Sequence, residues 1–302
     1  MRIAHLSDLH LLSLDGARAL DFAGKRLLGG INLALNRGRH YSARVFEAMV
    51  DDVNAQGVDH VACTGDLTNL ALESEFRFAR EHFDRFRIGP AAVTCIPGNH
   101  DGYVPAVRGV FETTFAPYCA PDEGWGWNGA GHWPVVRMRG DVAIIAVSTS
   151  RPTHLLAAYG EVGAEQLARL DRVLGDPRLD GYFRLVLVHH PPVGRGARSM
   201  LRGFRDRAAF VELVARHGAE LVLHGHEHLD VTHEITRPTG GSILVRGIQA
   251  GTYDGGLAER QSRYRIYTVA RGAAGRPTVV GEELRIYRSG THTFAQDSAR
   301  AA

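Results

Sequence analysis

The chain has 302 residues, enough for one large α/β domain or two small ones, and its 44% hydrophobic content is ordinary for a folded globular protein. A formal net charge of +2 argues against bulk electrostatic binding of nucleic acid, so any basic function has to be local. Three scattered cysteines argue against a disulfide framework and favour a reducing compartment. The sequence shows no leader pattern and no apolar run of membrane-spanning length, so we expect a cytoplasmic protein.

The first hundred residues alternate between strand and helix patterns. This order is typical of a parallel sheet whose strands are joined by crossover helices. Ser42 stands where the first long helix would be capped, and Gly57 follows its end. The predicted elements are, in order, a strand over 2–7, a helix over 42–56, a strand over 58–64, a helix over 73–86 and a strand over 91–96.

A long insertion over residues 11–42 separates the first strand from the first helix. Within it, the stretch from Lys25 to Arg39 places an apolar face between basic residues at near-helical spacing. Three interpretations stay open: an amphipathic helix packed on the body of the protein, an interfacial helix that dips into a lipid surface, and a dimer contact. The second would allow peripheral contact with the inner membrane surface through residues 20–40.

The second half begins with a surface flap over residues 117–134, whose tryptophans Trp125, Trp127 and Trp133 are either flap packing or a nucleobase platform. Four alternating runs near the end predict an antiparallel second sheet, and a polar tail over 290–302 is expected to fray. The sequence contains no linker that would divide the chain into independent domains, so we predict a single domain over 1–289. The expected elements are a hairpin of 135–138 and 142–148, a helix over 163–174, a strand over 183–188, a helix over 206–217, a strand over 220–223, and runs at 231–235, 242–248, 264–270 and 279–287.

Five polar motifs fall where predicted strands end, which in open α/β sheets is the edge where ligands bind. Their carboxylates, amide and imidazoles suit divalent metals, and no cysteine is placed to join them as in a structural zinc site. Seven or eight donors exceed the needs of one ion and fit two ions that share a carboxylate, for which Asp66 is the candidate. The motifs are Asp8-x-His10, Gly65-Asp66, Gly98-Asn99-His100-Asp101, His189-His190 and Gly225-His226-x-His228.

In this order the five motifs resemble those of the calcineurin-like metallophosphoesterases, over the span from Asp8 to His228. The resemblance implies an α/β fold, a four-layer α-β-β-α sandwich of two mixed sheets flanked by helices. It also implies a phosphohydrolase in which a hydroxide between two metal ions attacks phosphorus in line. The ions would be Mn²⁺, Fe²⁺ or Zn²⁺, which the sequence does not distinguish.

Residue roles follow from the same resemblance. It implies that one metal is held by Asp8, His10 and His228, that the other is held by Asn99, His189 and His226, and that Asp66 bridges them. His100 would contact the phosphate or protonate the leaving group, and Asp101 would orient His100. Neighbouring strand residues point to opposite faces, so His190 is expected to be a packing residue rather than a ligand.

The sequence shares features with two branches of the family. The motif forms look most like the bacterial phosphodiesterases, and the basic insertion looks loosely like the membrane-surface UDP-2,3-diacylglucosamine pyrophosphatases. A non-catalytic, metal-holding scaffold is the alternative of a different class. We expect no DNA substrate, because DNA-cleaving relatives need an extra capping region and little chain follows His228.

An arginine-rich segment follows the His189 motif directly. Arg195, Arg198 and Arg202 could form an anion site for a phosphoester or pyrophosphate substrate beside the metals, or a solvated face. Met200 and Leu201 are interleaved with them, which would suit an apolar or lipid-linked substrate.

Overall fold

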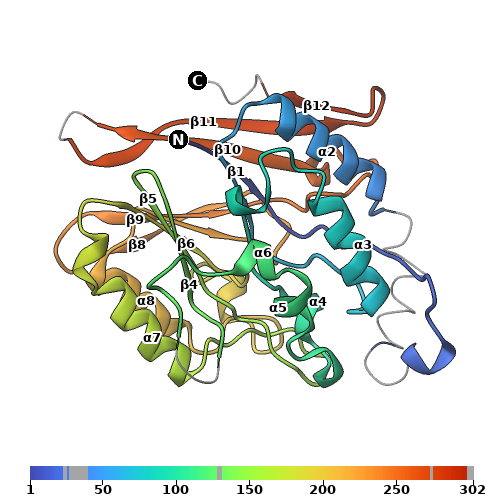
Figure 1. The fold of residues 1–302 in the computed structure, drawn as a ribbon, viewed down its shortest axis with the longest axis horizontal. Coiled ribbons are helices and arrows are strands. Elements are labelled where there is room, and N and C mark those ends of the chain that lie inside the picture. Colours follow the sequence, from blue (N-terminus) through green and yellow to red (C-terminus); the bar gives the residue numbers. More distant parts are fainter. Residues whose placement is uncertain (23–25, 27–39, 128–130, 273–274, 298–302) are drawn as a thin grey trace.

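The computed structural model describes residues 1–22, 26, 40–127, 131–272 and 275–297 (Figure 1). Two six-stranded mixed sheets pack against each other, with α2 and α3 beside the first sheet and α7 and α8 on the outer face of the second (Figure 1). The long helices are α2 (Ala43–Ala55), α3 (Glu73–Phe83), α7 (Ala164–Leu174) and α8 (Arg207–His217). The α/β sandwich implied by the sequence motifs is therefore confirmed.

The first sheet has the strand order β12-β11-β10-β1-β2-β3. β1, β2 and β3 run parallel, and β10, β11 and β12 are joined to them by antiparallel pairing. The bounds are β1 (Arg2–Leu6), β2 (His60–Cys63), β3 (Val93–Cys95), β10 (Arg263–Arg271), β11 (Pro277–Arg288) and β12 (Thr293–Gln296).

The second sheet has the order β4-β5-β6-β7-β9-β8. β5, β6, β7 and β9 run parallel, whereas β4 and β8 are antiparallel edge strands. The bounds are β4 (Val135–Arg139), β5 (Val142–Ala146), β6 (Phe183–Leu187), β7 (Leu221–His224), β8 (Thr232–Thr236) and β9 (Ser242–Gly247).

Alternation along the central strands divides the core into two layers. In β5, Ile144 belongs to the core between the sheets, whereas Ile145 belongs to the core under α7 and α8, and β6 and β7 repeat this alternation. Strands covered on both faces must be apolar at every position, and the burial of β5 is complete along its length. This rigid double layer fixes the strand ends from which the polar motifs project.

Two sequence predictions are wrong. The four C-terminal runs do not form one antiparallel sheet: β8 and β9 join the second sheet, where β9 lies parallel to β7, and β10 and β11 join the first, where β10 pairs with β1. The tail is not frayed throughout, because residues 293–296 form β12 against β11. Alternation reports that one face of a strand is buried, but it carries no information on which neighbour the strand pairs with.

Short helices fill the connections. They are η1 (Ala19–Phe22), η3 (Pro90–Ala92), α4 (Asn99–Gly102), η4 (Pro105–Val107), α5 (Val110–Thr114), α6 (Ala116–Cys119), η5 (Pro177–Leu179), η6 (Gly196–Arg198) and η7 (Ala258–Arg260). Nearly all of the Lys25–Arg39 stretch lies outside the described residues. In the described part of the chain, no helix combines the length and apolarity that a bilayer crossing requires.

The flap tryptophans serve as packing. Trp125 and Trp133 are buried, and the indole N–H groups of Trp127 and Trp133 donate to the Pro134 carbonyl (2.7 Å) and the Glu112 carboxylate (2.8 Å). Partnered and mostly covered rings offer no stacking platform to a base, so this alternative is not supported.

Candidate metal centre

The carboxyl ends of β1, β2, β3, β6 and β7 bring the five motifs together. Asp8 and His10 follow β1, Asp66 follows β2, Asn99 begins the short helix after β3, His189 follows β6, and His226 and His228 follow β7. Parallel strands put these ends on the same edge of each sheet, and the two sheets face each other, so donors from both meet between them. All seven side chains are buried except His228, which is partly exposed.

One group of donors consists of Asp8, His10 and His228. The Nε2 atom of His228 lies 3.1 Å from Asp8 Oδ1 and 3.1 Å from His10 Nε2. His10 Nε2 lies 4.0 Å from the same carboxylate oxygen. The three ligand atoms therefore converge on one point, as a metal ion would require.

A second group consists of Asn99, His189 and His226. The amide oxygen of Asn99 lies 3.2 Å from His189 Nε2 and 2.7 Å from His226 Nδ1. Asp66 stands between the groups, because its Oδ2 atom is 3.5 Å from His189 Nε2 and 3.9 Å from His10 Nε2. A carboxylate that faces an imidazole of each group has the position expected of a bridge.

Main-chain carbonyls and a phenol fix the orientation of three of these imidazoles. His189 Nδ1–H donates to the Thr64 carbonyl (2.7 Å) and His226 Nε2–H donates to the Arg202 carbonyl (2.8 Å), which leaves the opposite nitrogen of each ring as a lone-pair donor toward the site. The Nδ1 atom of His228 is hydrogen-bonded to the Tyr41 hydroxyl at 3.0 Å. Tyr41 was missed from the sequence because it lies far along the chain from every motif.

Charge at the site is compensated by imidazoles. Burial opposes ionisation of Asp66, but His189 and His100 hold its pKa well below the usual range. Burial likewise disfavours the charged form of His189, yet Asp66 and Asp8 raise its pKa to about 9. Among the described residues, no lysine or arginine pairs with Asp8 or Asp66. Two buried carboxylates whose ionisable partners are all imidazoles favour binding of added cations, so the donor set fits divalent metals.

Backbone strain is concentrated at the same place. Seven non-glycine residues of the described chain have positive φ, and five of them are donors, which leaves only Ala71 and His292 elsewhere. The five are Asp8, His10, Asp66, His226 and His228. Side chains other than glycine adopt this conformation at a cost of about 1–3 kcal/mol each, so it persists where the surroundings enforce it and is typical of functional sites.

The motif glycines are required by close approach of the loops. A Cβ atom on Gly65, Gly98 or Gly225 would stand well under 3.0 Å from neighbouring atoms. Gly98 would meet the Asp66 carboxylate and backbone, Gly225 would meet Ser7 and Asp8, and Gly65 would meet the backbone at Gly98. These three glycines therefore let the ligand loops pack directly on one another.

His100 and Asp101 do not form the expected pair. His100 Nδ1–H donates to the Asn69 carbonyl (2.6 Å), and its backbone N–H donates to Asp66 Oδ1 (2.7 Å). Asp101 instead accepts backbone N–H groups of Gly98 and of residues 67 and 68, at 2.8–3.1 Å. The prediction that Asp101 orients His100 is wrong, because the turn of α4 directs this carboxylate inward, where it ties two ligand loops together.

The three predicted substrate arginines have different surroundings. Arg202 lines a cavity of about 320 Å³ together with His226 and His228. Arg195 and Arg198 are exposed and do not line this cavity. Sequence reasoning missed other residues that line it, namely His40, Tyr41, Glu227, Gln249, Ala250, Tyr253 and Arg260.

His190 lies next to a donor but faces away from the centre, as predicted. Its ring nitrogens are hydrogen-bonded to the Thr149 hydroxyl (2.7 Å) and, as donor, to the Ala158 carbonyl (3.0 Å). Both nitrogens are therefore engaged in holding the loops behind the site.

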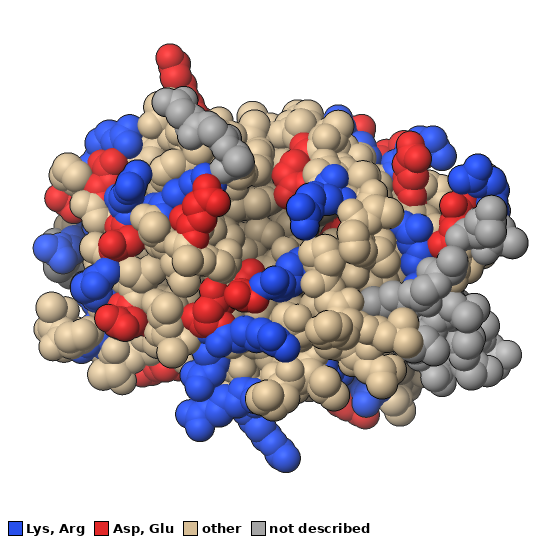
Figure 2. All heavy atoms as spheres, turned by 90° about the horizontal axis from the view of Figure 1, so that it is seen from below, with Lys and Arg blue, Asp and Glu red and all other residues tan. Residues whose placement is uncertain are grey.

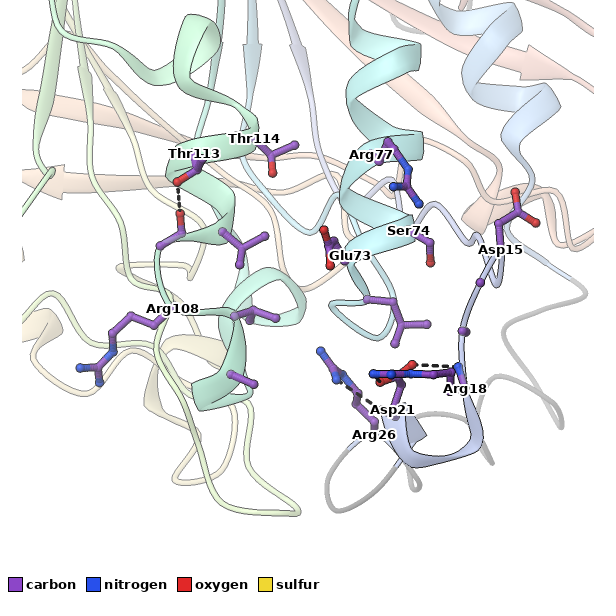
Figure 3. Close-up of a pocket in the computed structure, with 17 residues that line it drawn as sticks. Asp15, Arg18, Asp21, Arg26, Glu73, Ser74, Arg77, Arg108, Thr113 and Thr114 are labelled. Atoms are coloured by element: carbon purple, nitrogen blue, oxygen red, sulfur yellow. Dashed lines mark hydrogen bonds and ion pairs between the residues drawn. The ribbon is translucent and has the colours of Figure 1, made fainter.

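A further cavity, of about 950 Å³, lies elsewhere, between η1, α3 and α5 (Figure 3). None of the seven donors lines it. Two of its four arginines are engaged, because Arg26 donates to the carbonyls of Leu70 and Ala71 and Arg18 pairs with Asp21. A third, Arg108, points away from the other labelled side chains (Figure 3). We therefore assign the chemistry to the donor cluster.

Comparisons with known structures agree on the fold. Residues 1–230 match the family of calcineurin-like phosphoesterases. A purple acid phosphatase from yellow lupin (Lupinus luteus, PPD1) superposes with a TM-score of 0.59 at 12% identity over 98% of this chain, which spans about half (52%) of that protein. A dimetal phosphatase from Danio rerio has a TM-score of 0.51 at 12% identity over 98% of both chains. Among curated proteins, no sequence matches this chain.

Fold and donor set together define an α/β protein with a buried site for two divalent metals. With three quarters of its length matched, the chain belongs to the calcineurin-like phosphoesterase family. The solved relatives are too distant in sequence to indicate more than the fold, so the reaction has to be argued from the site.

Proposed function

We propose that this protein is a metal-dependent phosphohydrolase that cleaves phosphodiesters or pyrophosphates, as in the bacterial phosphodiesterase branch of the family. The observation that carries the proposal is the convergence of seven N and O donors: two groups of three, with Asp66 between them. Asp8, His10 and His228 would hold one ion, and Asn99, His189 and His226 the other. When bound, two Mn²⁺, Fe²⁺ or Zn²⁺ ions would supply charge stabilisation and a water of lowered pKa.

The chain's own residues would position and protonate the substrate. His100 is fixed through Nδ1 by the Asn69 carbonyl, which leaves Nε2 as the nitrogen near Asp66 and His10. A histidine held beside the centre in this way can contact a phosphate oxygen and give a proton to the departing oxygen. Asp101 would act only as a positioning residue, by holding the loops that carry Asp66 and His100.

The cavity beside the centre favours a substrate with two substituents on the phosphorus or a second phosphate. At about 320 Å³ it can hold a group well beyond the reacting phosphate, and Arg202 and Arg260 offer two cations in its wall. The rings of Tyr41 and Tyr253, 5.8 Å apart, add an aromatic surface. A nucleotide-linked lipid pyrophosphate is the second candidate, favoured by the exposed apolar residues Met200 and Leu201 next to Arg202.

Turnover of bis-p-nitrophenyl phosphate with added Mn²⁺ tests the proposal. We expect hydrolysis that requires the metal, exceeds that of p-nitrophenyl phosphate, and is abolished by chelation or by Asp66→Asn. Val280→Asp, a change at an exposed strand position far from the motifs in sequence, is the matched control and should keep full activity. Protein that binds two Mn²⁺ yet remains inert toward both esters would instead support the metal-holding scaffold.

A further inference from the structure

The exposed large hydrophobic side chains are unevenly distributed. Eight are exposed among the described residues, and only Val280 lies in a strand, β11. The other seven lie in loops that follow β1, β5, β6, β7 and β9, at the edge where the metal centre is formed. Exposed apolar residues scattered singly need no explanation, but their concentration on one edge of the molecule indicates an interaction surface.

Two of these loops form one continuous tip. The Ala158 N–H donates to the Leu201 carbonyl (2.7 Å), and the Gly160 N–H donates to the Gly203 carbonyl (3.0 Å). This pairing places the loop that carries Leu155 and Leu156 beside the loop that carries Met200 and Leu201. We call these four residues the apolar tip; Leu156 and Met200 are its most exposed members, at 77% and 84%.

The two segments that form the tip carry positive charge only, and the nearest acidic side chains, Glu161, Asp206 and Glu227, lie beside these segments rather than in them. Segments 151–160 and 193–205 contain five arginines and no acidic residue. Two of the five are engaged, because Arg151 pairs with Glu161 and Arg205 lies 3.4 Å over the ring of Tyr159. The side chains of Arg195, Arg198 and Arg202 are exposed, and Arg202 lies in the same cavity wall as Glu227. Figure 2 shows arginine side chains projecting along one border of the hollowed lower face of the molecule, with acidic side chains next to them on the inner side.

The tip is connected directly to the metal centre. The Arg202 carbonyl accepts the Nε2–H of His226, and Arg202 also lines the cavity beside His228. A surface that contacts the tip would therefore lie at the mouth of this cavity.

We infer that the apolar tip and its arginines dock on a phospholipid bilayer that contains anionic headgroups. Guanidinium groups bind phosphate in a bidentate manner, and leucine and methionine side chains can enter the boundary between headgroups and acyl chains. A bilayer fits better than a protein partner, because the apolar side chains project from loop ends and the segments that carry them contain arginines but no acidic residue. Docking itself is independent of the proposed hydrolysis, but it would present the cavity to phosphoesters at a membrane surface.

Co-sedimentation of the full chain with vesicles tests the inference, and chelator in the buffer keeps it separate from catalysis. We expect binding to vesicles of phosphatidylcholine with 30% phosphatidylglycerol, weak binding to phosphatidylcholine alone, and release at high salt. Leu156→Asp with Met200→Asp should weaken binding at least tenfold. Arg195→Gln with Arg198→Gln should weaken it about 25-fold, since each lost arginine is worth roughly fivefold, or about 1 kcal/mol.

Val280→Asp is the matched control, because this side chain is 55% exposed in a strand outside the tip. It should leave vesicle binding unchanged, and equal melting temperatures of all variants would show that folding is intact. Failure of the wild-type chain to bind anionic vesicles would overturn the inference. The inference would also be overturned if the Leu156/Met200 variant bound anionic vesicles as tightly as the wild-type chain. A wild-type chain that dimerises with rising concentration through Leu156 and Met200, and does not bind vesicles, would overturn it as well.

Discussion

Alanine at Gly98 should displace Asp66 without any change in the chemistry of the site. Gly98 has φ of −93°, a conformation that alanine adopts freely, so the substitution introduces no backbone strain. Its added methyl group, however, would stand well under 3.0 Å from the carboxylate and the backbone nitrogen of Asp66. The loops cannot rotate past each other, because Gly98 N–H is held by Asp101 and Gly98 O by the Ser150 hydroxyl (2.7 Å).

The expected loss of stability and activity in Gly98→Ala follows from overpacking. One extra methyl in a closely packed site costs roughly 1–3 kcal/mol. At roughly 2–4 °C per kcal/mol for a chain of this size, the melting temperature of the metal-free protein should fall by about 2–12 °C. Movement of Asp66 by about 1 Å should lower kcat/KM on a diester by roughly 10²-fold, because catalysis depends steeply on position.

Thermal unfolding in chelator and hydrolysis of bis-p-nitrophenyl phosphate with Mn²⁺ measure the two effects. Gly290→Ala is the control, since nothing lies within 4 Å of its added methyl group and its φ is not positive. A Gly98→Ala protein with the melting temperature and turnover of this control would refute the view that contact between the two loops positions Asp66.

Three further predictions concern single side chains. His100→Ala should leave two metals bound and slow turnover by roughly 10²–10⁴-fold; an empty site by metal analysis would show that His100 is a ligand instead. Tyr41→Phe removes the hydroxyl at 3.0 Å from His228 Nδ1 and should weaken the binding of one of two Mn²⁺ ions by roughly 10–100-fold, as measured by calorimetry. Mn²⁺ affinities equal to those of the wild-type protein would show that Tyr41 does not orient His228 for metal binding. Burial and His189 lower the pKa of His190 from 6.5 to about 3, so its contribution to stability is present above pH 6.5 and lost as pH falls. Between pH 6.5 and 5, the free energy of unfolding of the metal-free wild-type protein should therefore fall by about 2 kcal/mol more than that of the His190→Asn variant, as measured by urea unfolding. Equal decreases in the two proteins would contradict a lowered pKa of His190.

Sequence patterns were sufficient where the signal is local. The largely apolar runs followed by polar residues predict β1, β2 and β3 and the ligand loops after them, because a parallel strand covered on both faces is mostly apolar. The spacing of histidine and aspartate at successive strand ends likewise predicts which side chains meet, since parallel strands end at a common edge.

Local patterns failed where the outcome depends on partners distant along the chain. The sequence patterns did not predict that β9 pairs with β7 or that β10 pairs with β1. They also did not predict that the Asp101 carboxylate points away from His100. It also gave no sign that Asn69 would hold His100 or that Tyr41 would hold His228.

The amino-acid sequence thus determined the donor set and the edge at which it gathers, because both depend on strand direction and residue type. Only the tertiary structure decided the pairing of the C-terminal strands, the residues that orient each imidazole, and the exposure of an arginine-rich apolar tip beside the centre. These features arise from contacts between segments far apart along the chain, such as Arg2 and Thr268 in the paired strands β1 and β10, or Tyr41 and His228, which are 187 residues apart. Periodicity and spacing within one segment do not predict such contacts.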